Sequence, residues 1–162
     1  MNILDQELIG IELGLRIPKK GKKIFKRVGI KFLDKDPVGG FGTQIEKEKY
    51  SIQKFFDKYS IPLIISKLLF FETEHELRNF LKDNLKSGND VILRYNNVIF
   101  KSGEKGHGHF SVISEYDDKT AEVVIGDPDP PFFKKASLKQ ILYSISNKLD
   151  GQRRGFYIIC RN

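Results

Sequence analysis

Two residues that can do acid–base chemistry lie at the ends of a predicted β-hairpin. The segment GHGHFSVISEYDDKTAEVVIGDPDPP, residues 106–131, places His109 at the head of one strand and Asp127 at the exit of the next. The Asp-Asp turn between the strands would return both side chains to one end of a sheet. A histidine acts as a general base near neutral pH when a carboxylate holds its other ring nitrogen. The spacing therefore predicts a base-and-orienter pair, with a surface histidine beside a turn aspartate as the alternative.

The other two histidines are weaker candidates for the base. His107 would share the strand face of His109, but it stands between glycines, whereas His109 borders the apolar run that begins at Phe110. His75 falls in the first turn of a predicted helix, where we expect it to face solvent. Three histidines placed so unequally do not indicate a metal site, and we expect no cofactor.

A base and its orienter need a nucleophile, and the sequence contains a single thiol. Cys160 lies in the predicted last strand, where a buried cysteine behaves as a small hydrophobic residue. A reactive thiolate is favoured at a helix N-terminus or beside a cation, and a mid-strand position offers neither. We therefore expect Cys160 to be buried and structural. Gln44 could donate to an oxyanion, but no cysteine follows it, and Gly39, Gly40 and Gly42 indicate a flexible turn.

Length and composition indicate one globular domain. The chain has 162 residues, of which 40% are hydrophobic and 30% charged, so we expect a single domain over residues 1–162. No stretch approaches the roughly 20 apolar residues of a spanning helix. The N-terminus has neither a basic leader nor an apolar run of signal-peptide length. One cysteine excludes an internal disulfide. These features predict a cytoplasmic protein with no membrane span.

The charge of the chain raises the question of nucleic acid. The formal net charge is +7 and the isoelectric point is near 9.4. The densest basic patch is PKKGKKIFKR, Pro18–Arg27, within a Gly- and Lys-rich loop over about 18–42 that we expect to be mobile. Such a patch could follow a phosphate backbone. Like-charged runs more often lie in water, so nucleic acid is an unlikely partner and a minor alternative.

Helix caps and strand-like runs predict an α+β fold. Apolar residues at helical spacing follow four capping residues, Asp5, Ser51, Thr73 and Ser137. Thr73 with Glu76 and Ser137 with Gln140 have the spacing of capping boxes, and Gly14 and Gly88 are placed to end helices. Strand-like runs occupy residues 63–71, 90–95, 110–116, 121–125 and 156–160. Because short turns join the later strands, we expect N-terminal helices packed on a mostly antiparallel sheet.

These motifs together resemble a known family. The run GHGHFSVIS, then VVIGDP, then the capped helix SLKQILYSI and the closing strand GFYIIC look like the C-terminal half of papain-like cysteine peptidases. The nearest branch is the one that trims double-glycine leaders from exported peptides. Upstream, QELIGIELGL resembles the segment that follows the nucleophile helix of that family. The resemblance implies a papain-like fold, with His109 as the base and Asp127 as its orienter.

The chain departs from that family at the nucleophile. The family's cysteine, and the glutamine that helps to stabilise the oxyanion, should precede QELIGIELGL, and the sequence begins at Met1. One hypothesis is a non-catalytic or truncated peptidase-like domain that binds a peptide or a partner protein. The alternative is an active cysteine peptidase or acyl-transfer enzyme whose nucleophile lies upstream of Met1 or on another chain. Losing a central helix would expose apolar surface, which makes a homodimer possible.

Overall fold

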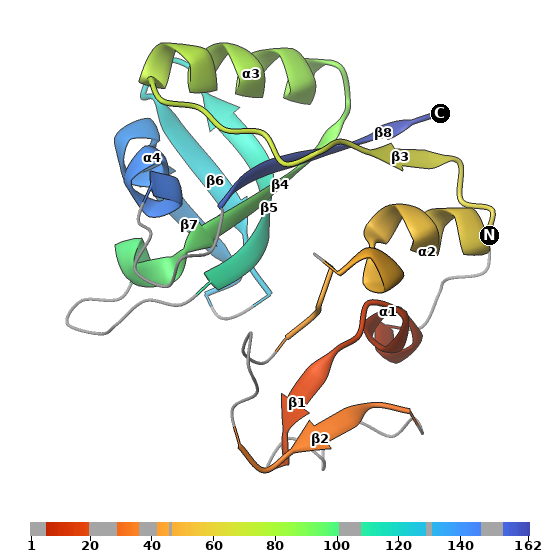
Figure 1. Cartoon of the computed structure of the whole chain (residues 1–162). Helices are drawn as coiled ribbons and strands as arrows, with labels where there is room; N and C mark the ends of the chain where they lie inside the picture. The colour runs from red at the N-terminus through yellow and green to blue at the C-terminus, as the bar shows by residue number, and fades with distance from the viewer. Residues whose placement is uncertain are drawn as a thin grey trace. The chain divides into compact units, whose positions relative to one another are not determined.

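The computed structural model describes residues 6–19, 29–35, 42–45, 47–100, 108–128, 131–146 and 154–162. Within these residues the fold is α+β, as predicted: four α-helices accompany a six-stranded antiparallel sheet and a small parallel sheet (Figure 1). The chain divides into two compact units, residues 1–62 and 63–162. None of the helices in the described ranges is long and apolar enough to cross a membrane. The single-domain organisation stays a prediction.

The first unit consists of short elements. They are α1 (Gln6–Glu12), β1 (Arg16–Pro18), β2 (Lys31–Leu33), the 3-10 helix η2 (Glu48–Tyr50) and α2 (Ile52–Lys58). Gly14 follows α1 with φ +69°, a left-handed conformation that favours glycine and ends the helix as predicted. Ser51 caps α2, because its hydroxyl accepts a hydrogen bond from the backbone N–H of Lys54. Most of the loop over 18–42 lies outside the described residues.

The second unit contains the large sheet. In chain order its elements are β3 (Leu63–Ile65), α3 (Glu74–Lys86), β4 (Asp90–Asn96), η3 (Asn97–Phe100), β5 (Gly108–Asp117), β6 (Glu122–Gly126), β7 (Phe133–Ser137), α4 (Leu138–Ser146) and β8 (Gly155–Arg161). The strand order is β3-β8-β4-β5-β6-β7, and every neighbouring pair is antiparallel. The predicted strand over 63–71 is shorter, since only Leu69 rejoins the sheet, as an isolated bridge. Strand β7 was not predicted from the sequence.

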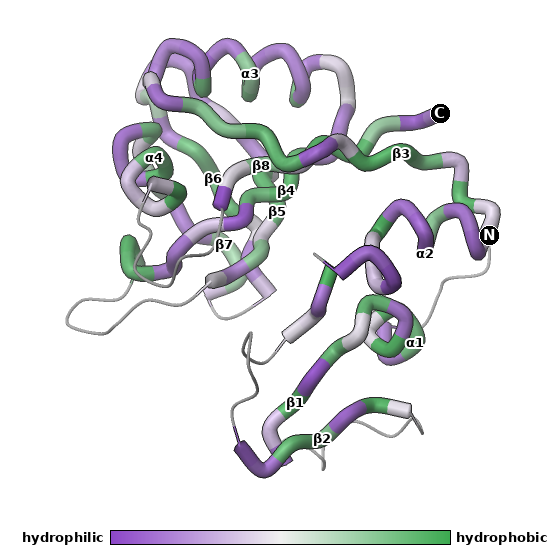
Figure 2. The backbone as a smooth tube through the Cα atoms, in the orientation of Figure 1, coloured by the Kyte–Doolittle hydropathy of each residue, from purple (hydrophilic) through white to green (hydrophobic). Residues whose placement is uncertain are grey.

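Helices α3 and α4 cover one face of this sheet (Figure 1). Both begin as predicted: Thr73 and Glu76 form a reciprocal capping box, and Gln140 bonds both the backbone N–H and the hydroxyl of Ser137. Along its length α3 is mostly hydrophilic, with hydrophobic positions between (Figure 2). Its inward residues Leu77 and Leu81 are fully buried. They pack with apolar residues of the strands and of α4: Val91, Leu93, Ile113, Val123, Ile125, Leu138, Ile141 and Phe156.

One irregularity in the hairpin β5–β6 decides which side chains face this core. Near the turn Asp117 pairs with Glu122 and Glu115 with Val124, but beyond Ser114 the register shifts, so that Ile113 pairs with Ile125. The extra residue is a β-bulge, and the hydroxyl of Ser114 bonds the carbonyl of Val124 across it. Successive side chains alternate between the two faces of a sheet. The shift therefore reverses, relative to β6, which side chains of β5 before Ser114 point toward the core.

Candidate functional site

A polar row continues the apolar core face at one end of the sheet. In β4 the residues Val91 and Leu93 face the core, and Tyr95 follows them on the same face. Tyr95 is the register partner of His109 in β5, and Leu93 is the partner of Ser111. All of these side chains therefore point to the side that α3 and α4 cover.

The bulge places Asp127 on the same face as His109. Val112 pairs with Gly126, so the next pair outward is Ser111 with Asp127. Without the shift at Ser114 the residue opposite Asp127 would be Val112, whose side chain points to the other face of the sheet. Asp127 also closes the following turn, because its backbone N–H donates to the carbonyl of Phe132 at 2.8 Å.

The predicted base and orienter are in hydrogen-bond contact. His109 Nε2 lies 3.0 Å from Asp127 Oδ1. Since an ionised carboxylate only accepts hydrogen bonds, this contact favours the tautomer with the proton on Nε2. The lone pair is then on Nδ1, which is the nitrogen that can take a proton from a nucleophile. The catalytic role of the pair stays a prediction, but its geometry is the one such a role needs.

Asp127 has three further donors on its other oxygen. Its Oδ2 accepts from Tyr95 Oη at 2.8 Å, from Ser111 Oγ at 3.1 Å and from Lys134 Nζ at 2.9 Å. The Asp127 side chain is fully buried, while those of His109 and Lys134 are each 14% exposed. Four described donors, two of them able to carry a positive charge, compensate the burial of this carboxylate. They fix the orientation of the carboxylate.

Aromatic rings surround the polar group. The ring of Tyr95 meets those of His109 and Phe100 edge to face, with centroids 5.7 Å and 6.0 Å apart. Lys134 Nζ lies 5.6 Å from the centroid of Phe100, within the range of a cation–π contact. The edge-to-face contact with Tyr95 helps to hold the imidazole of His109, and the apolar ring atoms lower the local dielectric, which strengthens the bond from His109 to Asp127.

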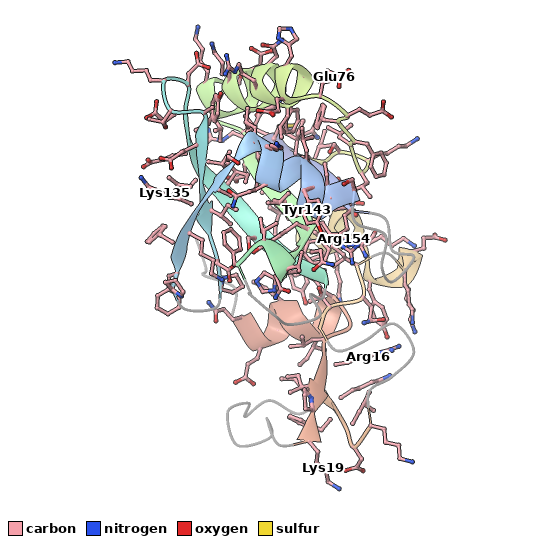
Figure 3. The ribbon with its side chains drawn as sticks, turned by 90° about the vertical axis from the view of Figure 1, so that its left-hand side faces the viewer. Arg16, Lys19, Glu76, Lys135, Tyr143 and Arg154 are labelled. Carbon is pink, nitrogen blue, oxygen red and sulfur yellow. The ribbon has the colours of Figure 1, made fainter. Side chains whose placement is uncertain are left out.

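Sequence reasoning missed three residues of this network: Tyr95, Ser111 and Lys134. A signal for the first two was present, because both stand at core-facing positions of strands whose other inward residues are apolar. Lys134 could not be found without β7, whose FKKAS sequence has two adjacent lysines. Lys134 reaches Asp127, while Lys135 points outward, with 68% of its side chain exposed (Figure 3).

The expectation of a buried Cys160 is only half met. The thiol is half-buried, beside the edge strand β3, where Cys160 pairs with Ile64. Ile159 pairs with Asp90 at the start of β4, so Cys160 lies beyond the far end of the strand that carries Tyr95. His109 lies opposite Tyr95, and Cys160 lies one step beyond the position opposite Asp90, so the two are six residue steps apart along β4. Six steps along a strand correspond to about 20 Å. Cys160 is therefore far from His109 and cannot serve it as a nucleophile.

The remaining sequence candidates lie apart from this group. His75 is exposed on α3, as predicted, and its Nε2 lies 3.1 Å from the side-chain amide of Asn79. His107, Gly39 and Gly40 lie outside the described residues. Gln44 is buried in the first unit, where its amide contacts only neighbouring backbone carbonyls among the bonds described. Across the described ranges no group of three or more His, Cys, Asp or Glu side chains could hold a metal ion.

The arrangement can accept and hold a proton. His109 supplies the acceptor nitrogen, Asp127 stabilises the imidazolium that results, and Tyr95, Ser111 and Lys134 keep the carboxylate in place. No protein-family model matches the chain, and no characterised protein matches it significantly.

Proposed function

We propose that residues 63–162 form a cysteine-peptidase-like domain that binds a peptide or a partner protein at the end of the sheet marked by His109 and Asp127. The observation that carries the proposal is the contact between His109 Nε2 and the fully buried carboxylate of Asp127. The order of motifs along the chain, with its resemblance to papain-like leader peptidases, supports the same interpretation.

An exposed aromatic side chain next to the dyad supports peptide binding. Phe132 is 60% exposed, and its carbonyl accepts the backbone hydrogen bond from Asp127. Phe133, the first residue of β7, pairs with Gly126 and therefore faces the other side of the sheet. Large exposed aromatic residues are common anchors at binding surfaces, because they bury much area with few rotatable bonds. An extended peptide crossing this end of the sheet could bury Phe132.

The part of the chain that the structure describes offers His109 no nucleophile for a covalent step. The only cysteine, Cys160, is at the other end of the sheet from His109. Ser111 is buried, and its hydroxyl donates to Asp127 instead of to the imidazole. A base without a nucleophile forms no acyl intermediate. The chain by itself is thus expected to bind peptides without cleaving them.

The test combines cleavage and binding on the purified chain. We expect no hydrolysis of a pool of short fluorescent peptides, and binding of some members that His109→Ala weakens. Phe132→Ala should weaken binding further, whereas Phe70→Ala, which removes an exposed aromatic residue elsewhere in the second unit, should not. Cleavage that His109→Ala abolishes would overturn the non-catalytic proposal. Binding unaffected by all of these changes would remove the site.

A second candidate is an enzyme whose thiol comes from a separate segment or polypeptide. The observation in its favour is the set of described donors that holds the Asp127 carboxylate against His109 Nε2, the contact that favours the tautomer a base requires. A domain that only binds peptides has no need of that tautomer. The check is a thiol-dependent acyl transfer: with an added small thiol and an activated ester, this candidate predicts an acceleration that His109→Ala removes and Cys160→Ser leaves intact. No acceleration by the wild-type protein would exclude it.

A further inference from the structure

The positive charge of the chain is concentrated in one short segment. Residues 16–35 contain nine lysines and arginines and a single acidic residue, Asp34, for a net charge of +8. Because the whole chain carries +7, the other 142 residues sum to −1. The excess of cations is therefore a local property of the first unit and not a consequence of a lysine-rich composition.

Strand pairing brings cations from both parts of this segment together. β1 and β2 run parallel, and Arg16 in β1 is the register partner of Lys31 in β2. Figure 3 shows Arg16 and Lys19 on this part of the molecule. Lys19 forms an ion pair with Asp34, with 2.9 Å between Nζ and Oδ1. Like charges directly opposite one another on neighbouring strands repel. A phosphate group placed between Arg16 and Lys31 would be attracted by both charges.

Tyr50 lies within the field of the same cations. Lys49 Nζ is 4.6 Å from the centroid of the Tyr50 ring. A hydrogen bond from Lys49, with smaller contributions from the charges of Lys31 and Arg16, lowers the pKa of the Tyr50 phenol, although burial acts in the opposite direction. A position where three cations stabilise a phenolate also stabilises the oxygen of a bound anion.

The ring itself is held in place. It packs on Gly14, where an added Cβ would lie 2.6 Å from a ring carbon. With Lys49 also over the ring, Tyr50 is not an open platform on which a base could stack. A ligand would instead meet the phenol hydroxyl and the flanking cationic groups, which suits phosphate oxygens better than bases.

The distribution of apolar surface distinguishes between possible anionic partners. The large hydrophobic side chains exposed among the described residues are Ile64, Phe70, Val112, Phe132, Phe133 and Tyr143, all in the second unit. Stable attachment to a membrane needs an inserted apolar group or a second anchor besides charge. Protein interfaces likewise have an apolar centre. Sequence-independent binding to nucleic acid needs no exposed apolar residues, since contacts to phosphates supply its affinity.

We propose that Arg16, Lys31, Lys49 and Tyr50 form a binding surface for the phosphate backbone of nucleic acid, without sequence preference. This proposal is independent of the dyad in the second unit, since it uses no residue of that unit. With three cations engaged, the logarithm of affinity should fall against the logarithm of salt concentration with a slope of about −2 for a single strand.

The experiment measures binding of a labelled oligothymidylate of about 20 nucleotides by fluorescence anisotropy at several salt concentrations. We expect the double variant Lys31→Glu with Lys49→Glu to bind at least about tenfold more weakly and with a shallower salt slope. Both lysines are exposed, so the variant should fold. The control is Lys67→Glu with Lys139→Glu, which makes the same charge change at exposed sites in the second unit. It should bind nearly as wild type does.

Several outcomes would overturn the proposal. Failure of the wild-type protein to bind at low salt, or an equal loss in the control variant, would show that these four residues form no site. Binding of poly-glutamate as tight as that of the oligonucleotide would indicate a general attraction to polyanions. Tight binding to vesicles rich in anionic lipid, without oligonucleotide binding, would indicate a membrane surface. Circular dichroism of each variant confirms that it is folded before its affinity is compared.

Discussion

The hairpin β5–β6 carries an aspartate network at each end, and the two networks are built from similar residue types. At the turn, Asp118 accepts a hydrogen bond from Lys82 Nζ at 2.8 Å and from the hydroxyl of Tyr116 at 3.3 Å. At the open end, Asp127 also has a lysine and a tyrosine among its donors. The two groups differ in burial: the Asp118 side chain is 47% exposed and that of Asp127 is fully buried.

Burial changes how much the same contacts contribute to stability. An exposed ion pair gains little, because water and salt screen it and the side chains lose rotational freedom. A buried carboxylate must have its donors, since losing one leaves a charge in a medium that solvates it poorly. Of the two networks only the buried one contains a histidine, so only there can the carboxylate orient an imidazole. The comparison therefore separates a surface contact from a candidate site.

The largest expected effect comes from replacing the two aspartates. Asp127→Asn removes the partner of His109 and leaves the Lys134 ammonium without its counter-charge, so the free energy of unfolding should fall by about 3 kcal/mol. Asp118→Asn should change it far less, because water and salt screen the exposed ion pair. Urea denaturation of both variants measures the difference. Equal losses would mean that burial does not distinguish the networks.

The lysines should show the same contrast on a smaller scale. Lys134→Met keeps the aliphatic stem but removes one charged donor to Asp127, which should destabilise the protein by about 2 kcal/mol. Lys82→Met should be nearly neutral. Thermal unfolding of the pair at low and high salt gives the comparison, since salt screens the exposed pair and hardly affects the buried one. A strongly salt-dependent effect at Lys134 would contradict the buried position.

Removing single hydroxyl groups tests the tyrosines. Tyr95→Phe should cost about 1 kcal/mol, because Asp127 loses one of its donors while the ring packing remains. Tyr116→Phe removes a donor to an exposed carboxylate and should have almost no effect. A nitrogen-15 spectrum of the imidazoles in Tyr95→Phe is the second readout: His109 should keep its proton on Nε2, since Asp127 Oδ1 still accepts from it.

The smallest effect is the pH dependence of the exposed network. The hydrogen bond from Lys82 lowers the pKa of Asp118, with help from Tyr116 and Arg78. A lowered folded-state pKa contributes stability that is present above the unfolded pKa and is lost as the pH falls through the folded pKa. The difference in stability between wild type and Asp118→Asn should therefore shrink from neutral pH to about pH 3. A constant difference would show that the ion pair contributes nothing.

Most of the fold could be predicted because local signals were strong. Caps at Ser51, Thr73 and Ser137 and the glycines after α1 and α3 mark helix ends through contacts within a few residues. Strands β1, β2 and β7 were missed, since each is short and carries charge, and only pairing with a distant neighbour makes it a strand. Pairing of that kind leaves no local pattern.

The site could be predicted in part. His109 and Asp127 were found from their positions at the ends of a hairpin, and the structure brings them within 3.0 Å. The bulge at Ser114, without which the two side chains would lie on opposite faces, was not predicted. Lys134 was missed because it arrives from β7, and the position of Cys160 depends on pairing with β3, which the sequence pattern does not reveal.

The bulge at Ser114 also sets a counting rule for recognising relatives of this chain. His109 and Asp127 are eighteen positions apart, which is an even number. Near the turn, paired residues such as Asp117 and Glu122 are an odd number of positions apart, so without the bulge only residues at an odd spacing would share a face. A related sequence could therefore keep both residues in an alignment and still separate them, if one residue were lost from the paired part of β5 or β6 and the bulge stayed. A relative that lost the residue together with the bulge would keep the pair. Conservation of His109 and Asp127 alone is thus insufficient evidence for the dyad. The strand residues between them must also be conserved in number, or the bulge must be gained or lost together with the one-residue change.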